Sequence, residues 1–182
     1  MDAGQTLLEP EDLLRMPDGD GYELIDGVPK ERPMGAEADQ IAAEIVSLMR
    51  PFAKAGKLGR VFGSQTGYRC FPGRPKLVRI PDVSFVADGR FPDGKVPRGH
   101  INLVPELVVE VVSPNDYYEE VEQKVAEYRS AGVKLVWVIN PGTKTVLVRR
   151  LDRTCAEIDE AGTLSGEDVL PGFTCAVAEL FV

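Results

Sequence analysis

The sequence of 182 residues is poor in cysteine, histidine and tryptophan, and no apolar run approaches the ~20 residues of a membrane span. Its three cysteines, Cys70, Cys155 and Cys175, form no C-x-x-C pair, so we expect neither a disulfide framework nor a zinc–thiolate site. The single histidine, His100, lies in a polar stretch and is expected to be incidental. No basic segment followed by an apolar one opens the chain, which argues against a secretory signal. These absences predict a cytoplasmic protein that does not bind membranes.

The composition is that of a globular protein. Hydrophobic residues make up 43% of the chain and charged residues 27%, which excludes a disordered or fibrous chain. At about 100–200 residues per domain, the length predicts a single domain over residues 1–182. We expect residues 1–8 to be disordered.

The charge is distributed unevenly. The chain has 21 Lys and Arg against 29 Asp and Glu, a net charge of −8 that argues against a protein that coats nucleic acid. Residues 1–49 carry a net charge of −9, residues 50–100 carry +8 and residues 101–182 carry −7. The basic segment 50–100 could therefore bind a polyanion such as DNA, or its charges could pair with the acidic flanks. Its basic residues are Arg50, Lys54, Lys57, Arg60, Arg69, Arg74, Lys76, Arg79, Arg90, Lys95 and Arg98.

The hydrophobic pattern alternates between helical and strand-like spacing. Helical spacing predicts helices over residues 9–16, 37–53 and 116–131, the last one ended by Gly132. Pro51 should lie near the end of the second helix or kink it. Runs rich in Val, Ile and Phe predict strands over residues 60–71, 77–87, 106–113, 133–139 and 145–150.

A hairpin is predicted near the N-terminus, because Asp26-Gly27 suits a tight turn between strands at residues 22–25 and 28–32. The tail, residues 170–182, should pack on the core. The order of elements indicates a mixed α/β domain around one sheet.

Glu110 interrupts the otherwise apolar strand LVVEVV at residues 107–112. Such a strand is central in its sheet, where an isolated carboxylate costs several kcal/mol unless something neutralises it. A metal ion would do so, and so would an arginine in a structural salt bridge.

Asp82, in the segment IPDVSFV, shares a face with Ile80, Ser84 and Val86 by the two-residue period of a strand. Pro81 removes a backbone donor, so we expect this strand end at a sheet edge or a bulge. The alternative is that Asp82 only binds backbone near Pro81.

Lys124 lies on the stripe formed with Val121, Val125 and Tyr128, which predicts that this lysine faces the core. It could instead pack its methylenes there and extend its ammonium group to the edge of the helix. Taken together, two carboxylates and one ammonium group directed at the same core indicate a functional site.

The segments IPDVSFV and ELVVEVVSP resemble the PD…(D/E)-x-K arrangement of the restriction-endonuclease-like superfamily. More specifically, YELIDG, RIPDVSFV, PELVVEVVSPND, KVAEYRSAGVKLVWVINP and LSGEDVLPGF, in this order, resemble the Uma family of putative restriction endonucleases. The resemblance implies a restriction-endonuclease-like mixed central sheet flanked by helices, with N-terminal hairpin additions.

The resemblance assigns Asp82 and Glu110 as metal ligands, with the backbone carbonyl of Val111 as a third. The catalytic lysine of the superfamily falls at Val112 here, and Lys124 of the following helix matches its relocated position in the Uma family. An acidic residue completes the site, for which Glu23 in YELIDG is favoured over Glu44 on the first long helix.

The resemblance also implies Mg²⁺ or Mn²⁺ as cofactor, because such ions prefer oxygen ligands. The function expected is that of a metal-dependent DNA endonuclease, with DNA bound through the basic segment and a homodimer as the assembly. The alternatives are a catalytically silent nuclease fold that acts in oligomerisation or in partner and nucleic-acid binding, and hydrolysis of another phosphoester.

Overall fold

A computed structural model describes residues 6–32, 35–114 and 116–181 of the chain. Its centre is a six-stranded mixed sheet in the order β3-β4-β5-β6-β7-β8, in which only β5 and β6 are parallel. The six strands are β3 (Gly59–Phe62), β4 (Val83–Ala87), β5 (Leu107–Val111), β6 (Leu135–Asn140), β7 (Thr145–Arg150) and β8 (Cys155–Ile158). The predicted mixed α/β fold is confirmed.

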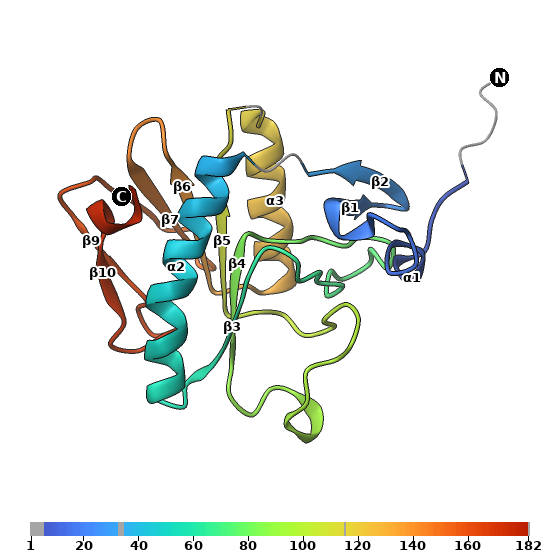
Figure 1. Ribbon diagram of the computed structural model, residues 1–182, viewed down its shortest axis with the longest axis horizontal. Coiled ribbons are helices and arrows are strands. Elements are labelled where there is room, and N and C mark those ends of the chain that lie inside the picture. The colour runs from blue at the N-terminus through green and yellow to red at the C-terminus, as the bar shows by residue number, and fades with distance from the viewer. Residues whose placement is uncertain (1–5, 33–34, 115, 182) are drawn as a thin grey trace.

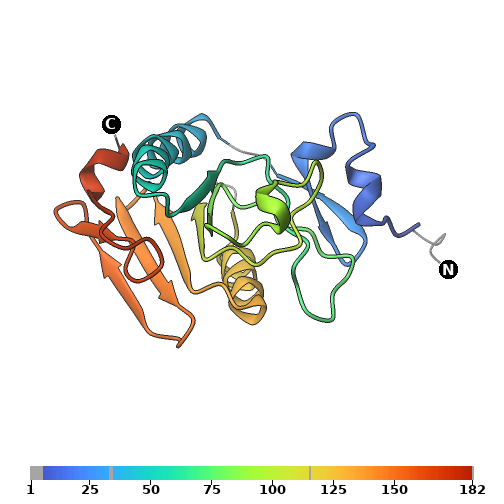
Figure 2. The ribbon, with the colours of Figure 1, turned by 90° about the horizontal axis from the view of Figure 1, so that it is seen from below.

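Two long helices cover opposite faces of this sheet (Figures 1 and 2). They are α2 (Ala36–Ala55) and α3 (Tyr118–Ala131), and α3 is the crossover between the parallel strands β5 and β6. Gly132 ends α3 in the left-handed region at φ 98°, as predicted. Pro51 lies within α2, which continues through Ala55.

Each face of the sheet has its own apolar core. On the α2 side, Ile41, Ile45 and Met49 pack against Val109 and Trp137. The C-terminal tail closes this core as predicted, through Leu170, Phe173, Val177 and Leu180. On the α3 side, Val125 and Tyr128 pack against Val108, Val136 and Val138.

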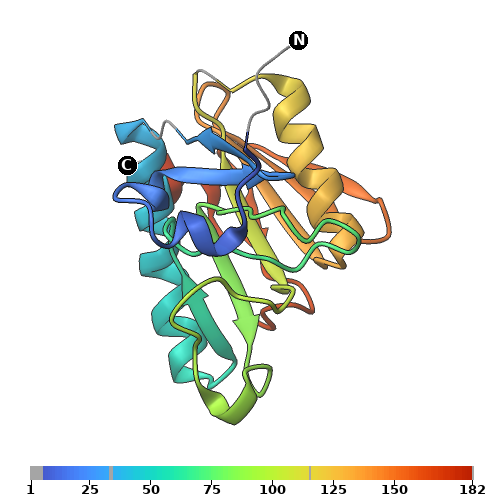
Figure 3. The same cartoon turned by 90° about the vertical axis from the view of Figure 1, so that its right-hand side faces the viewer.

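The small elements lie around the sheet. They are α1 (Pro10–Leu13), the hairpin β1 (Tyr22–Ile25) and β2 (Val28–Glu31), the pair β9 (Thr163–Ser165) and β10 (Thr174–Ala176), and the 3₁₀ turns η1 (Gly19–Gly21), η2 (Pro92–Gly94) and η3 (Val177–Phe181). The hairpin has the predicted tight turn, with φ of 50° at Asp26 and 91° at Gly27. It lies between α3 and the N-terminal end of α2 (Figure 3).

The strands predicted over residues 60–71 and 77–87 are too long. The sheet holds Gly59–Phe62 and Val83–Ala87 of them, and the chain between makes isolated bridges, such as Leu24 with Val78 and Tyr68 with Arg79. Val78 and Ile80 are buried against the hairpin and α1 rather than in the sheet, which explains their apolar character.

Pro81 was expected at an edge or a bulge, yet β4 lies between β3 and β5 inside the sheet. The proline is tolerated because β4 begins two residues later, at Val83, so that no ladder hydrogen bond is lost.

The first helix is shorter than predicted and spans four residues. Of residues 1–8, expected to be disordered, residues 1–5 lie outside the described part. The backbone N–H of Leu8 donates to the carbonyl of Gly27 at 2.8 Å. In the described ranges, no helix combines the length and the apolar character needed to cross a bilayer.

Candidate active site

Asp82 and Glu110 meet because β4 and β5 are antiparallel, so that the beginning of one strand lies beside the end of the other. The backbone N–H of Asp82 donates to the carbonyl of Val109 at 3.1 Å. The Asp82 carboxylate then accepts a hydrogen bond at Oδ2 from the N–H of Val111, at 2.7 Å. These two hydrogen bonds to Val109 and Val111 hold Asp82 beside Glu110, which lies 28 positions later in the sequence.

Glu110 points toward α3, because its neighbours Val109 and Val111 fill the opposite core. Its Oε2 accepts from Lys124 Nζ at 2.8 Å, and its Oε1 accepts from the Tyr128 hydroxyl at 2.6 Å. The Glu110 side chain is 7% exposed and that of Lys124 is 21% exposed. The ammonium group therefore faces the buried carboxylate and not the outer edge of the helix.

Arg32, which follows the hairpin, also reaches this cluster. Its Nη2 donates to Asp82 Oδ1 at 3.1 Å and its Nη1 to the carbonyl of Ser64 at 3.0 Å. The side chains of Arg32 and Asp82 are 11% and 8% exposed. Sequence reasoning did not identify Arg32, because nothing in the local pattern reveals an ion pair formed across 50 positions.

Glu23 on β1 is enclosed by donors and is 2% exposed. Its Oε1 accepts from the N–H of Ile80 at 2.9 Å, and its Oε2 accepts from Arg79 Nη1 at 2.7 Å. Arg79 also donates through Nε to Glu127 Oε2 at 2.6 Å, and Arg74 donates to the same glutamate. This buried chain of ions ties the hairpin to α3, and neither Arg79 nor Glu127 was identified from the sequence.

Glu44, the alternative to Glu23, lies half-buried on α2, where the Ser47 hydroxyl donates to its backbone carbonyl at 2.8 Å. It is not among the residues that line the pocket around Asp82, whereas Glu23 is. Val112, at the superfamily's lysine position, packs into the apolar core on the α3 side.

The charges in the cluster perturb one another. Burial raises the pKa of Asp82 to about 7, with a further contribution from the nearby Glu110, although the Val111 N–H, Arg32 and Lys124 act in the opposite direction. Burial alone would raise the pKa of Glu23, but the charges of Lys124 and Arg79 hold it below its usual range. Burial would lower the pKa of Lys124, yet its acidic neighbours, led by Glu110, raise it.

These side chains line a pocket of about 410 Å³. Its walls come from the hairpin, the two ends of β4 and β5 that meet, and the beginnings of α2 and α3. The lining residues are Glu23, Lys30, Glu31, Arg32, Ala38, Asp82, Glu110, Val111, Ser113, Asp116, Tyr117, Glu120 and Lys124. The structure thus brings Asp82, Glu110, Lys124 and Glu23 to one cavity.

The donor set limits which metal ions fit. Within the described ranges, no three His, Cys, Asp or Glu side chains gather into a metal-binding group. Of the six carboxylate side chains that line the pocket, those of Asp82 and Glu110 lie beside Val111. Such a set is compatible with Mg²⁺, which is held by one or two carboxylates and keeps several waters, and does not match a structural zinc site.

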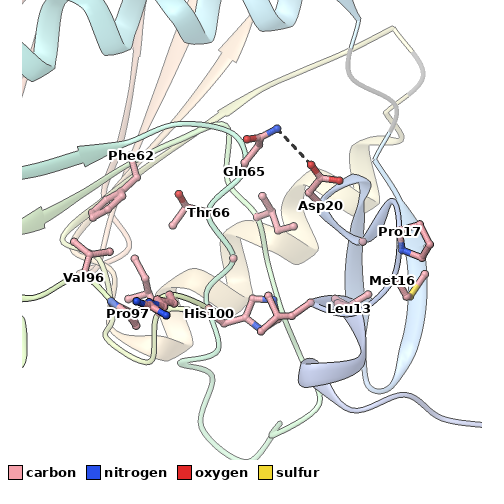
Figure 4. A pocket seen from close by; sticks show the side chains of 17 residues that line it. Leu13, Met16, Pro17, Asp20, Phe62, Gln65, Thr66, Val96, Pro97 and His100 are labelled. Carbon is pink, nitrogen blue, oxygen red and sulfur yellow. Dashed lines mark hydrogen bonds between the residues drawn. The ribbon is translucent and has the colours of Figure 1, made fainter.

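A second pocket, of about 440 Å³, lies beside the N-terminal segment (Figure 4). Leu13, Met16 and Pro17 face Phe62, Val96 and His100 across it. Asp20 is the one carboxylate among the residues that line this pocket, and its Oδ2 accepts from Gln65 Nε2 at 3.4 Å. The pocket does not contain the acidic pair of the first one.

The basic segment divides into two groups. Five of its eleven basic side chains form ion pairs with acids of the flanking segments: Arg69, Arg74, Lys76, Arg79 and Arg90. The other six have no ion pair with an acid in the described ranges: Arg50, Lys54, Lys57, Arg60, Lys95 and Arg98. Pairing with the acidic flanks, the alternative to DNA binding, therefore accounts for about half of the basic side chains of this segment.

The comparison with family models matches residues 10–178 to Uma2, described as "Putative restriction endonuclease". Among solved structures, the chain is similar to a "putative nuclease belonging to DUF820" from Anabaena variabilis, at 21% identity and a TM-score of 0.78. The match covers 96% of this chain and 97% of that one. No curated protein matches the chain.

Proposed function

Because the chain belongs to the Uma2 family, we propose that it is a metal-dependent endonuclease that hydrolyses DNA phosphodiester bonds. The observation that carries the proposal is the meeting of Asp82, Glu110 and Lys124, from three separate elements, in one pocket. Two ion pairs, Arg32 with Asp82 and Lys124 with Glu110, lie in this one pocket. Burial and the nearby Glu110 raise the pKa of Asp82, and a buried charge cluster with a perturbed pKa in a pocket is typical of catalytic sites.

In this proposal, Asp82 and Glu110 hold Mg²⁺ or Mn²⁺, with the carbonyl of Val111 as a third ligand. A bound ion of this kind lowers the pKa of its water and offsets negative charge on a phosphate. The Val111 N–H supports the assignment, because it fixes one oxygen of Asp82 in place. The Tyr128 hydroxyl does the same for Glu110.

We assign Lys124 the role of a cation. Its Nζ lies 2.8 Å from Glu110 Oε2, and in the protein without a bound metal ion its acidic neighbours raise its pKa above the usual value. A protonated amine donates hydrogen bonds and cannot accept a proton from water. It therefore orients the attacking water or stabilises charge on the phosphate oxygens.

Glu23 is a positioning residue in this scheme. Its two oxygens accept from Arg79, which also binds Glu127, and from the backbone of Ile80, so that Glu23 belongs to the ion network that joins the hairpin to α3. Its negative charge raises the pKa of Lys124 and so helps to keep that side chain protonated.

The test is nicking of plasmid DNA by the purified chain with Mg²⁺ or Mn²⁺. We expect Asp82→Asn and Glu110→Gln to abolish nicking, and Lys124→Met to reduce it by about 10²-fold or more, the loss typical of one charge-stabilising donor. Glu44→Gln is the matched control and should retain wild-type activity. Nicking that survives both carboxylate substitutions would overturn the proposal.

One observation favours a second function, a catalytically silent nuclease fold that binds nucleic acid or a partner. Asp82 and Glu110 are both already neutralised by protein cations, Arg32 and Lys124. DNA binding without cleavage in Mg²⁺ and in Mn²⁺ would support this function. A homodimer, which would place two sites on two strands, is also proposed and is tested by sedimentation equilibrium.

We propose further that DNA approaches through the unpaired part of the basic segment. Arg50, Lys54 and Lys57 lie in the C-terminal part of α2 or directly after it. Lys54 is about 24 Å along the helix from Ala38, which lines the pocket, at 1.5 Å per residue. A duplex that contacts both would span about seven base pairs at 3.4 Å each.

A further inference from the structure

We propose that Arg32 has two successive partners: Asp82 before a divalent cation binds, and the phosphate of the DNA strand afterwards. The inference rests on the proposed nuclease function and deepens it by naming a phosphate-binding residue. It concerns a residue that the family motifs found in the sequence do not include.

The first step is the geometry of Arg32. Its guanidinium group donates to Asp82 Oδ1 at 3.1 Å and to the carbonyl of Ser64 at 3.0 Å. Its backbone N–H donates to the carbonyl of Gly21 at 2.9 Å, which fixes the main chain at this point. A change of partner therefore needs movement of the side chain alone, within a pocket that it already lines.

The second step compares Arg32 with Arg79, the other buried arginine, which binds the pocket residue Glu23. Arg79 is held by two buried carboxylates, those of Glu23 and Glu127. Arg32 is held by one carboxylate and one neutral carbonyl. Of the two arginines, Arg32 is therefore the one with a single charged partner, and the one more easily released.

The third step is the effect of a divalent cation. Asp82 and Glu110 would hold the cation, whose positive charge would neutralise Asp82 in place of Arg32 and would disfavour a guanidinium group at the same carboxylate. Asp82 keeps its orientation without Arg32, because the Val111 N–H still holds Oδ2 at 2.7 Å. Oδ1 is the oxygen that would lose its donor when Arg32 leaves.

The fourth step is the new partner. Once released, the guanidinium group would exchange its carboxylate partner for the phosphate that the substrate brings into the same pocket. Among the other acids that line the pocket, Glu120 already pairs with Lys30 and Asp116 accepts from the Ser113 N–H. The planar guanidinium fork matches two oxygens of a phosphate group, whereas the Lys124 ammonium acts as a point charge. Arg32 is thus suited to hold the DNA backbone once the ion is in place.

The experiment uses the full chain and two measurements that do not depend on cleavage. Calorimetry measures Mn²⁺ binding without DNA, well above pH 7. Fluorescence anisotropy measures the affinity for a labelled DNA duplex in EDTA and in Ca²⁺, with the integrity of the DNA checked on a gel. The variants are Arg32→Gln, Arg32→Lys and, as a matched control, Arg150→Gln. Arg150 lies on β7 and forms a partly exposed ion pair with Glu167.

We expect Arg32→Gln to bind Mn²⁺ about tenfold more tightly than the wild type, because no charged donor competes for Asp82. It should also lose most of the gain in DNA affinity that Ca²⁺ gives the wild type. Arg32→Lys retains the positive charge and controls for a loss of folding caused by removing it. This variant should bind Mn²⁺ as the wild type does but should lose the gain in DNA affinity. Arg150→Gln should match the wild type in both measurements.

Two results would overturn the inference alone: Mn²⁺ affinity that is unchanged or weaker in Arg32→Gln, or a full Ca²⁺-dependent gain in DNA affinity in both Arg32 variants. A wild-type chain that binds no Mn²⁺ and does not nick DNA would overturn the proposed function as well. The two failures are therefore distinguishable.

Discussion

Replacing Asp82 with asparagine should flatten the dependence of stability on pH. In the folded protein the pKa of Asp82 is raised from its usual 3.8 to about 7, chiefly by burial. The folded state therefore holds the proton more tightly than the unfolded state does. The stability that this proton contributes is complete below about pH 4 and is lost as the pH rises through about 7.

The magnitude follows from the two pKa values. At about 1.4 kcal/mol per pH unit, the difference between 3.8 and about 7 corresponds to at most about 4 kcal/mol of unfolding free energy. Asp82→Asn cannot bind this proton and lacks the contribution. Between pH 4 and pH 8 the wild type should therefore lose up to about 4 kcal/mol more than the variant does.

The assay is urea denaturation followed by circular dichroism at several pH values, without divalent cations. Opposing contributions, such as the lowered pKa of Glu23, are common to both proteins and cancel in the comparison. Asp88→Asn, at an exposed position after β4, is the control and should follow the wild type. If Asp82→Asn and the wild type show the same pH dependence, the raised pKa of Asp82 and the burial argument behind it are wrong.

Three further substitutions, with Arg150→Ala as a control, test the framework of the site and of α3 by urea denaturation. Arg79→Ala should cost about 3–5 kcal/mol because it removes a buried cation from two buried carboxylates, of which Glu127 keeps Arg74 as a partner. Arg150→Ala, at a partly exposed pair, should cost less than about 1 kcal/mol. Equal losses would contradict this account. Tyr128→Phe should cost about 1–3 kcal/mol by removing a buried donor to Glu110, and no loss would exclude that bond. Gly132→Ala should cost about 1 kcal/mol through its φ of 98° alone, since no atom lies near the added methyl group; a much larger loss would point to a clash.

The parts of the site that could be predicted are those in which a polar residue breaks a local pattern. Glu110 was visible because it interrupts an apolar strand, and Lys124 because it lies on the apolar stripe of a helix. The structure adds that the two side chains satisfy each other at 2.8 Å. A charged residue in an apolar pattern indicates a partner, because an unpaired buried charge is costly in free energy regardless of where in the sequence the partner lies.

The parts that could not be predicted depend on partners distant in sequence. Arg32 and Glu127 lie where charged residues are ordinary, at the end of a hairpin and beside the apolar stripe of α3. Their roles can be recognised only from the fold, which brings Arg32 to Asp82 and Glu127 to Arg79.

The same limit explains the strand predicted over residues 77–87. Val78 and Ile80 are apolar because they are buried against the hairpin and α1, and periodicity does not distinguish this burial from burial in a sheet. The sheet strand begins after Pro81, where backbone pairing with β5 becomes regular.

The salt dependence of DNA binding distinguishes a basic segment that binds DNA with all of its basic residues from one in which some of them are paired with protein acids. If all eleven basic residues contacted phosphates, the slope of log K against log salt concentration would be about −10. Five of them are paired with protein carboxylates, and exchanging those pairs for phosphate would leave acids unpaired, one of them the buried Glu23. Contact through the remaining six predicts a slope no steeper than about −5. Charge reversal at Arg50, Lys54 and Lys57 should then remove about half of that slope, while a slope near −10 would mean that DNA opens the ion pairs that hold the hairpin to the rest of the domain.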